Sequence, residues 1–285
     1  MNLALGETIT LAPVVIFAFN RPDHLKRCID SLLRNKGSEF TEFWVFVDGP
    51  RSTDDEIKIH EVFLILNNFK DRKNWHLRFS EKNLGLANSV ITGLNTVFEK
   101  SVRVIIIEDD LVASPYFLEY CNFGLDKYEM DQRVASLHGF SYGFNKPEKN
   151  PYFLRGADCW GWATWKDRWQ LFEADSNKLI SQIRRNRLKR KFDLDGVYPY
   201  FNMLIRQSRG EVNSWELDGM LQCFWLINSH FTQIKLSLII MELMGAVHMR
   251  GKARASTPNS LICQLTSRVS KYEKIKGLEA NLKVF

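Results

Sequence analysis

Apolar and polar positions alternate along the first 130 residues in blocks that predict strands and helices in turn. Short runs rich in β-branched and aromatic residues predict buried strands at 13–19, 43–47, 75–79 and 102–107. Between and after them, apolar residues at helical spacing predict helices at 22–33, 52–69, 86–97 and 116–128. Four alternating units with short connections favour a mostly parallel sheet covered by helices on both faces.

Polar side chains follow each of these predicted strands. Asn20 and Arg21 follow the first, Asp48 the second, Lys82 the third, and Glu108-Asp109-Asp110 the fourth. Because the carboxyl ends of parallel strands meet at one edge of a sheet, we expect these residues to lie together. Clustered carboxylates are hard oxygen ligands, which suit Mg²⁺ or Mn²⁺ carrying a phosphorylated substrate. The alternative is a solvated acidic loop that closes a core strand.

Two common phosphate-binding motifs are missing from the chain. No G-x-G-x-x-G follows the first predicted strand, and G-x-x-x-x-G-K-[ST] occurs nowhere. This counts against a dinucleotide-dependent dehydrogenase and against a P-loop NTPase.

Beyond residue 130 the regular alternation of strand and helix ends. The pattern predicts a short strand at 134–137, a helix at 216–228 and a last strand at 234–240. The chain after residue 248 is rich in Arg, Lys, Ser and Pro, which is typical of a loose tail.

Four tryptophans lie within twelve residues of the second half. Trp160 and Trp162 flank a flexible glycine, and we expect them to line a cleft, where they would contact an acceptor. Trp165 and Trp169 are assigned instead to an aromatic core cluster, which is also the alternative for the first two.

The charge of the chain favours anionic partners. The net charge is +6 and the pI is near 9.0, which suits nucleotides, nucleic acid or an acidic membrane surface. Six of the eight residues 184–191 are cationic, so this segment is either a solvated helix face or a contact for anionic lipid or acceptor. Its basic residues are not interleaved with aromatic ones, as single-stranded nucleic acid would require, so no nucleic-acid partner is expected.

The 285 residues, of which 45% are hydrophobic, can bury a full core as one large α/β domain. Five widely separated cysteines predict neither a zinc site nor a disulfide framework. The first residues lack the basic and apolar parts of a signal peptide. The apolar segment 236–241 is far shorter than the roughly 20 residues that a bilayer requires. We therefore expect a cytoplasmic protein, peripheral at the inner face of the plasma membrane if the basic segment binds lipid.

Five segments together resemble the GT-A fold nucleotide-sugar glycosyltransferases. They read PVVIFAFNRPDHLKRCIDSLL, FVDGP, KNLGLANSV, VIIIEDDLVASPYFLEY and WGWATWKDRW. The likeness is to the N-acetylglucosaminyltransferase I-like group and to bacterial glycosyltransferases of the family 2 type. It implies an α/β, mostly parallel, Rossmann-like sheet flanked by helices, with a C-terminal acceptor-side extension. Residues 1–130 would then bind the nucleotide-sugar, 131–250 would form the acceptor-binding and catalytic half, and 251–285 would be a tail.

The resemblance also implies an activity. A sugar would pass from a UDP-sugar to a hydroxyl of a glycan or lipid-linked saccharide, in bacterial surface polysaccharide synthesis. Asp110 matches the acid that binds Mn²⁺ or Mg²⁺ directly, while Glu108 and Asp109 would face the ribose and the donor sugar. Asp48 resembles the acid that reads the uracil edge, and Arg21 resembles the arginine near the diphosphate.

The resemblance is looser for four further residues. Lys82 lies where a basic residue often follows the third strand. Glu216 or Asp218 resembles the catalytic base, and His248 resembles a histidine near the end of the domain that would join the metal. The sequence SWELDGM departs from the family's adjacent acids and from its W-x-x-R-W form, so the base stays open between the two, with Asp218 favoured. His248 is alternatively a core or loop histidine.

Two other classes of protein compete with this interpretation. A nucleotidyltransferase-like sugar-nucleotide enzyme would normally have a glycine-rich loop after the first strand, which FAFNRPD is not. A non-catalytic carbohydrate-binding protein would explain the tryptophans but not the acids at the strand ends.

Overall fold

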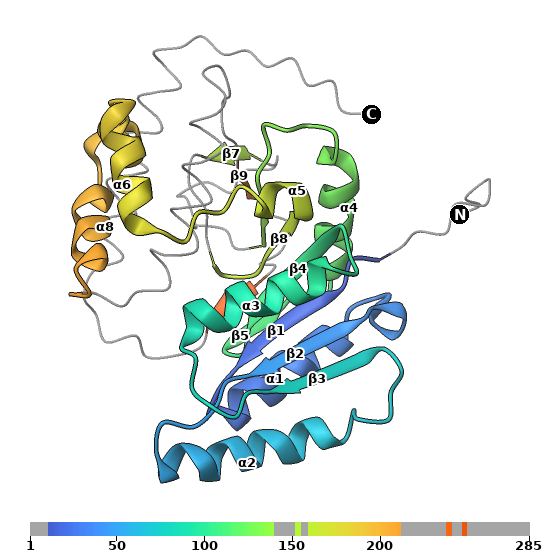
Figure 1. Ribbon diagram of the computed structural model, residues 1–285. Coiled ribbons are helices and arrows are strands. Elements are labelled where there is room, and N and C mark those ends of the chain that lie inside the picture. The colour runs from blue at the N-terminus through green and yellow to red at the C-terminus, as the bar shows by residue number, and fades with distance from the viewer. Residues whose placement is uncertain (1–10, 140–151, 155–158, 212–237, 241–246, 250–285) are drawn as a thin grey trace, which may run out of the picture.

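The computed structural model describes residues 11–139, 152–154, 159–211, 238–240 and 247–249 (Figure 1). Its first half alternates strands and helices as the sequence predicts. The elements are β1 (Val14–Ala18), α1 (Pro22–Leu33), η1 (Ser38–Phe40), β2 (Phe43–Val47), α2 (Thr53–Asn67), β3 (Trp75–Phe79), α3 (Leu86–Phe98), β4 (Arg103–Glu108), β5 (Leu111–Ala113) and α4 (Phe117–Tyr128). The predicted strands and helices are thus confirmed to within about two residues at their ends, which is the usual uncertainty of such boundaries.

The second half is less regular. Its elements are β6 (Leu137–His138), β7 (Tyr152–Leu154), β8 (Trp162–Trp165), α5 (Lys166–Trp169), α6 (Ser176–Arg185), α7 (Lys189–Phe192), η2 (Leu194–Gly196), α8 (Tyr200–Ser208), β9 (Leu238–Ile240) and β10 (Val247–Met249). The short strand predicted at 134–137 is found at 137–138 as β6. The predicted helix at 216–228 lies outside the described residues, and of the predicted strand at 234–240 only 238–240 is described.

The central sheet has the strand order β3-β2-β1-β4-β8-β6-β9-β7. Strand β1 lies between β2 and β4 and is parallel to both, with Ile16 opposite Val45 and Ile107. Strand β3 is parallel to β2, whereas β8 is antiparallel to β4. The prediction of a mostly parallel α/β sheet is therefore confirmed; its continuous parallel part is β3-β2-β1-β4, and β6 and β9 are a further parallel pair.

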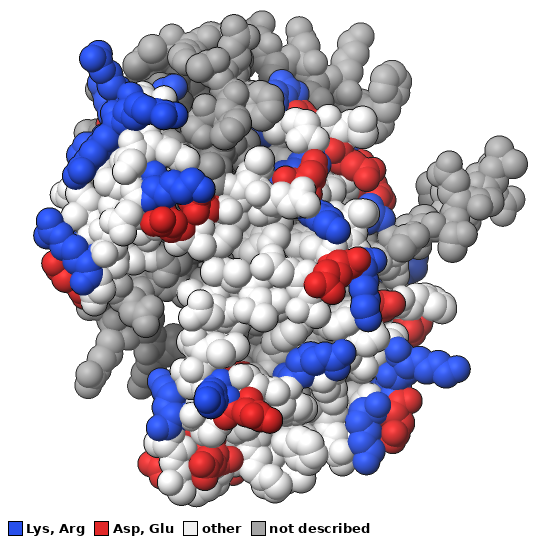
Figure 2. All heavy atoms as spheres, in the orientation of Figure 1, with Lys and Arg blue, Asp and Glu red and all other residues white. Residues whose placement is uncertain are grey.

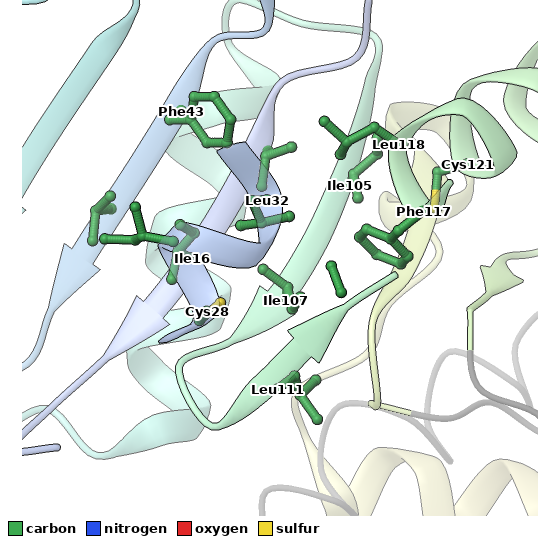
Figure 3. Close-up of a cluster of buried hydrophobic side chains, with 14 of the residues drawn as sticks. Ile16, Cys28, Leu32, Phe43, Ile105, Ile107, Leu111, Phe117, Leu118 and Cys121 are labelled. Carbon is green, nitrogen blue, oxygen red and sulfur yellow. The ribbon is translucent and has the colours of Figure 1, made fainter. Parts of the chain in front are cut away.

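The central strands are buried on both faces because helices cover both (Figure 1). Successive side chains of a strand point to opposite faces of the sheet. On one face, Ile16 and Ile107 pack with Cys28 and Leu32 of α1, as Figure 3 shows. On the other face, residues of α3 such as Leu94 pack against the alternate positions of β1 and β4. This explains why these strands are continuous apolar runs in the sequence.

Three of the four tryptophans belong to the core. Trp165 and Trp169 are buried, as predicted. The prediction that Trp162 lines a cleft is wrong, because β8 is an interior strand of the sheet and the Trp162 side chain is only 7% exposed. Its ring centroid lies 6.5 Å from that of Trp169. Trp160 is half-buried and packs against the edge of the core.

Helices α6, α7 and α8 form a small unit with a hydrophobic core of its own, and residues 176–211 are called the α6–α8 unit from here on. Its buried hydrophobic side chains are Leu179, Ile180, Ile183, Phe192, Phe201 and Leu204. Arg187 has a φ of 54° in the turn between α6 and α7. The unit lies to one side of the sheet, at the upper left of Figure 1. No helix in the described part of the chain is long and apolar enough to cross a membrane.

Candidate functional site

The loops after β1, β2, β3 and β4 meet at the carboxyl edge of the parallel strands, as the sequence predicts. Backbone hydrogen bonds continue from each strand into its neighbour's loop. Asp109 N donates to Phe17 O (3.1 Å), Asp48 N donates to Ala18 O (3.0 Å), and Ser80 N donates to Val47 O (2.9 Å). These bonds fix the starting points of the loops, so that the side chains beyond them are held in set positions.

Arg21 brings two of the predicted acids together. Its Nη2 lies 2.5 Å from Oδ1 of Asp109, and its Nη1 donates to Oδ2 of Asp110 over 2.8 Å. Arg21 is the N-cap residue of α1 and is followed by Pro22 in the first turn, where proline is favoured. The third acid, Glu108, ends β4 and is partly exposed. One guanidinium from the β1 loop is thus shared by two carboxylates from the β4 loop.

The two carboxylates that Arg21 contacts differ in their surroundings. Asp109 is fully buried, and its Oδ2 also accepts a hydrogen bond from Phe19 N over 3.2 Å. Burial raises the pKa of Asp109 to about 6; the charge of Arg21 opposes that rise and the charge of Asp110 adds to it. The Asp110 side chain is 36% exposed. Asp110 is therefore the carboxylate that a ligand can reach, and Asp109 lies behind it.

Asp48 joins the β2 loop to the β3 loop through the backbone. Its Oδ1 accepts from Leu84 N (2.8 Å) and from Gly49 N (2.9 Å), and its Oδ2 accepts from Gly85 N (2.9 Å). A Cβ atom on Gly49 would lie 2.4 Å from the carbonyl carbon of Lys82, so only glycine allows the two loops to approach this closely. The loops that contain Asp48 and Lys82 are therefore neighbours at the edge. That Asp48 binds the edge of a uracil stays a prediction.

A second charged network, which sequence reasoning missed, lies beside the first. The Asp55 carboxylate accepts from Asn20 Nδ2 over 2.5 Å and from Arg51 Nε over 2.9 Å. These bonds, with that from Arg51 the largest cause, lower the pKa of Asp55 to about 2. The Arg51 guanidinium lies 4.6 Å from the centre of the Phe19 ring.

Only part of this network could be predicted from the residues themselves. Ser52 Oγ accepts from Asp55 N, the hydrogen bond of a helix N-cap, for which serine is a favoured residue. A cap requires only that backbone N–H group, so the pattern leaves the direction of the Asp55 carboxylate open. The position of Arg51 directly after the Asp48-Gly49-Pro50 turn was the available clue.

The structure places the strand that contains His248 beside the acids. Strand β10 pairs with β5 in antiparallel fashion, with His248 opposite Val112, two residues after Asp110. Glu216 and Asp218, the two candidates for the catalytic base, lie outside the described residues.

The chemistry of the acids fits a hard divalent cation. Within the described residues, no three His, Cys, Asp or Glu side chains gather at one point. Asp109 and Asp110 nevertheless converge on a single cationic group, which shows that this corner of the edge accommodates positive charge. Mg²⁺ is commonly held by one or two carboxylates and completes its shell with substrate phosphates and water. Asp110 would hold such an ion directly, with Asp109 behind it.

A mostly parallel α/β sheet covered by helices on both faces is consistent with the GT-A fold. Residues 14–208 match the model of "Glycosyl transferase family 2". This match covers more than half of the chain, and the protein belongs to that family and is a glycosyltransferase. Comparison with curated proteins finds no match.

Several solved structures align with this chain at low scores. Residues 1–349 of TarS from S. aureus align with a TM-score of 0.47 at 10% identity, covering 96% of this chain and 76% of that one. The WbbM bifunctional glycosyltransferase aligns at 0.30 and 15% identity, covering 48% and 24%. A 4-diphosphocytidyl-2C-methyl-D-erythritol synthase from Anaerococcus prevotii aligns at 0.42 and 13% identity, covering 93% and 100%. These low scores add nothing to the family assignment.

Proposed function

We propose that this glycosyltransferase moves a sugar from a UDP-sugar to a hydroxyl of a glycan or lipid-linked saccharide, with Mn²⁺ or Mg²⁺ and with inversion at the anomeric carbon. In this proposal residues 1–130 bind the donor and residues 131–250 complete the acceptor side. The setting would be the synthesis of a bacterial surface polysaccharide. The donor, the metal and the stereochemistry extend the family assignment and rest on the following arguments.

The observation that carries the proposal is the convergence of Arg21, Asp109 and Asp110 at the carboxyl edge of the sheet. A nucleoside diphosphate is a poor leaving group unless its developing negative charge is neutralised. A divalent ion on Asp110 supplies that neutralisation without a protein acid. Arg21 would contact the diphosphate, and Glu108, which is partly exposed, would line the ribose and sugar side of the same corner. The expected contact of Asp109 with the donor is not retained, because its side chain is buried behind Asp110.

The uridine would lie at the β2 and β3 side of the edge. Asp48 and the loop that contains Lys82 are held together there by backbone contacts. A site held in advance in this way loses less conformational freedom when the ligand binds. Phe19 contacts residues of both parts of the edge, because its ring lies against the Arg51 guanidinium and its backbone N–H donates to Asp109.

The acceptor side would be formed by residues of the second half. The acceptor hydroxyl needs a carboxylate within hydrogen-bond reach to take its proton, and attack from the face opposite the diphosphate inverts the anomeric centre. Asp218 is proposed as this base, with Glu216 as the alternative. Trp160, which is half-buried, is proposed as an acceptor contact, whereas Trp162 is not retained because its ring is in the core.

A peripheral contact with an anionic membrane is part of the proposal because the basic residues gather on one small unit. Residues 176–211 contain nine Lys and Arg against three acidic residues, a net charge of +6 that equals that of the whole chain. Figure 2 shows a cluster of basic side chains at the upper left, over the end of the unit where α6 stops, while blue and red lie side by side lower on the unit and elsewhere on this face. A projecting basic end suits a flat anionic surface, and each cation near such a surface contributes about 1 kcal/mol.

Titration calorimetry with UDP, in Mn²⁺ and in EDTA, tests the nucleotide and metal parts of the proposal. We expect UDP to bind in Mn²⁺ and to lose most of its affinity in EDTA, because Asp110 supplies only part of the coordination shell. Equal affinity in both would remove the metal role. Hydrolysis of a panel of UDP-, GDP- and dTDP-sugars with Mn²⁺ then identifies the donor, and the anomeric configuration of the transfer product reports inversion or retention.

A further inference from the structure

Arg21 contacts the carboxylate that is proposed to bind the metal ion. Its guanidinium contacts both carboxylates at once, at 2.5 Å from Asp109 and 2.8 Å from Asp110. The Arg21 side chain is 42% exposed and that of Asp110 is 36% exposed, so a solute can reach the contact between them. The protein therefore carries its own cation at the acidic corner.

This internal cation must oppose a free metal ion. A divalent ion bound to Asp110 while Arg21 stays in place would put like charges within a few ångströms of each other, which is unfavourable. Moving Arg21 away would leave the guanidinium without an anionic partner and the buried Asp109 without its countercharge. Either route weakens the binding of a metal ion that arrives alone.

A diphosphate changes this balance because it offers the guanidinium a new anionic partner. Arginine binds phosphate oxygens through two parallel hydrogen bonds, as it does carboxylates. Asp109 would keep the hydrogen bond from Phe19 N when Arg21 turns away. The backbone of Arg21 need not move, since Leu25 N holds its carbonyl and Pro22 fixes the start of α1.

We propose that Arg21 makes the acidic edge selective for a metal–nucleoside diphosphate complex over a free metal ion. In the free protein Arg21 is paired with Asp110. When the complex binds, the guanidinium pairs with the diphosphate and the Asp110 carboxylate binds the metal ion. This inference rests on the proposed function, and it adds that metal and nucleotide binding are coupled through one side chain. Arg21 is then a specificity-determining residue as well as a donor contact.

Calorimetric titration of Mn²⁺ without nucleotide tests the proposal on the wild type, Arg21→Gln, Arg21→Lys and Arg34→Gln. Arg34 lies at the other end of α1 and is exposed, so its variant makes the same change of charge away from the site. We expect Arg21→Gln to bind Mn²⁺ alone about tenfold more tightly than the wild type, within the usual range of coupling between sites. Arg21→Lys, which keeps the charge, and Arg34→Gln should both resemble the wild type.

A second titration, of UDP with Mn²⁺ present, completes the test. Because linkage is reciprocal, Arg21→Gln should bind UDP more weakly and should show a smaller effect of Mn²⁺ on UDP affinity. Unchanged or weaker binding of Mn²⁺ alone by a folded Arg21→Gln protein would overturn the inference, even if UDP still requires Mn²⁺. Binding of UDP that is indifferent to Mn²⁺ in every protein would instead overturn the metal role in the proposed function.

Discussion

The carboxyl edge of the sheet and the α6–α8 unit use charge in opposite ways. At the edge, the acids are bound to particular atoms: Asp109 to Arg21 and Phe19 N, Asp48 to three backbone N–H groups, and Asp55 to Asn20 and Arg51. In the α6–α8 unit, Arg185, Arg187 and Lys191 are exposed and form no ion pair within the described residues. The contacts at the edge hold each carboxylate in one position, whereas the exposed cations of the α6–α8 unit create a positive electrostatic potential around it.

The two kinds of charge therefore differ in how a mutation should act. Removing a charge that is held in one geometry changes a single contact and its chemistry, with little effect at a distance. Removing one of several exposed like charges weakens attraction to an anionic surface roughly in proportion to the number removed, and salt should screen it. The following predictions test this contrast in order of decreasing effect.

Asp110→Asn should have the largest effect, at least about a thousandfold on the rate of sugar transfer, because it would remove the proposed metal ligand and the charge neutralisation that the metal ion would bring. The melting temperature should stay close to that of the wild type, since Asp110 lies outside the core. Acceptor-dependent turnover and thermal melting measure the two. Asp30→Asn on the exposed face of α1 is the control; near-normal activity of Asp110→Asn would end the metal assignment.

Asp218→Asn should lower kcat by about 10² to 10⁴, the usual contribution of a positioned general base, while donor affinity changes little. Glu216→Gln should cost much less. The two variants are compared in acceptor-dependent turnover and in UDP binding. The reverse ranking would reassign the base to Glu216, and two mild effects would show that neither residue is the base.

Replacing Arg185, Arg187 and Lys191 by glutamine should weaken binding to anionic vesicles by about a hundredfold, at about 1 kcal/mol for each cation lost. Flotation with anionic and with neutral liposomes measures this effect. Arg27→Gln, Arg34→Gln and Lys36→Gln together form the matched control, because these exposed residues lie on and just after α1 and change the net charge equally. Equal loss of binding in both triple variants, or wild-type binding that ignores lipid charge, would refute a docking surface on the α6–α8 unit.

The smallest predicted effect is on the free energy of unfolding. It comes from His138, a buried residue that belongs to neither charged region. Burial lowers the pKa of His138 to about 3. Below about pH 6.5 the unfolded chain binds a proton at His138, whereas the folded protein does not. Protonation therefore favours the unfolded chain, so the free energy of unfolding is highest above that pH and decreases as the pH falls. From about pH 8 to about pH 5 the loss should be about 2 kcal/mol.

Urea unfolding of the wild type and of His138→Gln at the two pH values measures this contribution. The difference in unfolding free energy between the two proteins isolates His138, because Asp109, whose raised pKa acts in the opposite direction, contributes equally to both. The stability advantage of the wild type should shrink by about 2 kcal/mol at the lower pH. A constant advantage would mean that His138 is protonated in the folded protein.

The local elements of the parallel half could be predicted from the sequence because each depends on neighbours in the chain. Strands that are apolar throughout must be buried on both faces, and helical spacing of apolar residues gives each helix one face to pack. The alternation then requires parallel pairing, which brings Arg21, Asp48, Lys82 and the acids after β4 to one edge. The family resemblance added roles for these residues, and the family is confirmed.

The tertiary structure alone decided what depends on partners far along the chain. Trp160 and Trp162 look alike in the sequence, but Trp162 begins β8, which lies between β4 and β6, and is buried, whereas Trp160 precedes the strand and stays partly exposed. Asp109 and Asp110 are adjacent, yet the turn after β4 buries one and leaves the other accessible. The sequence shows how apolar each residue is. The packing of strands and loops in three dimensions determines which neighbours cover that residue.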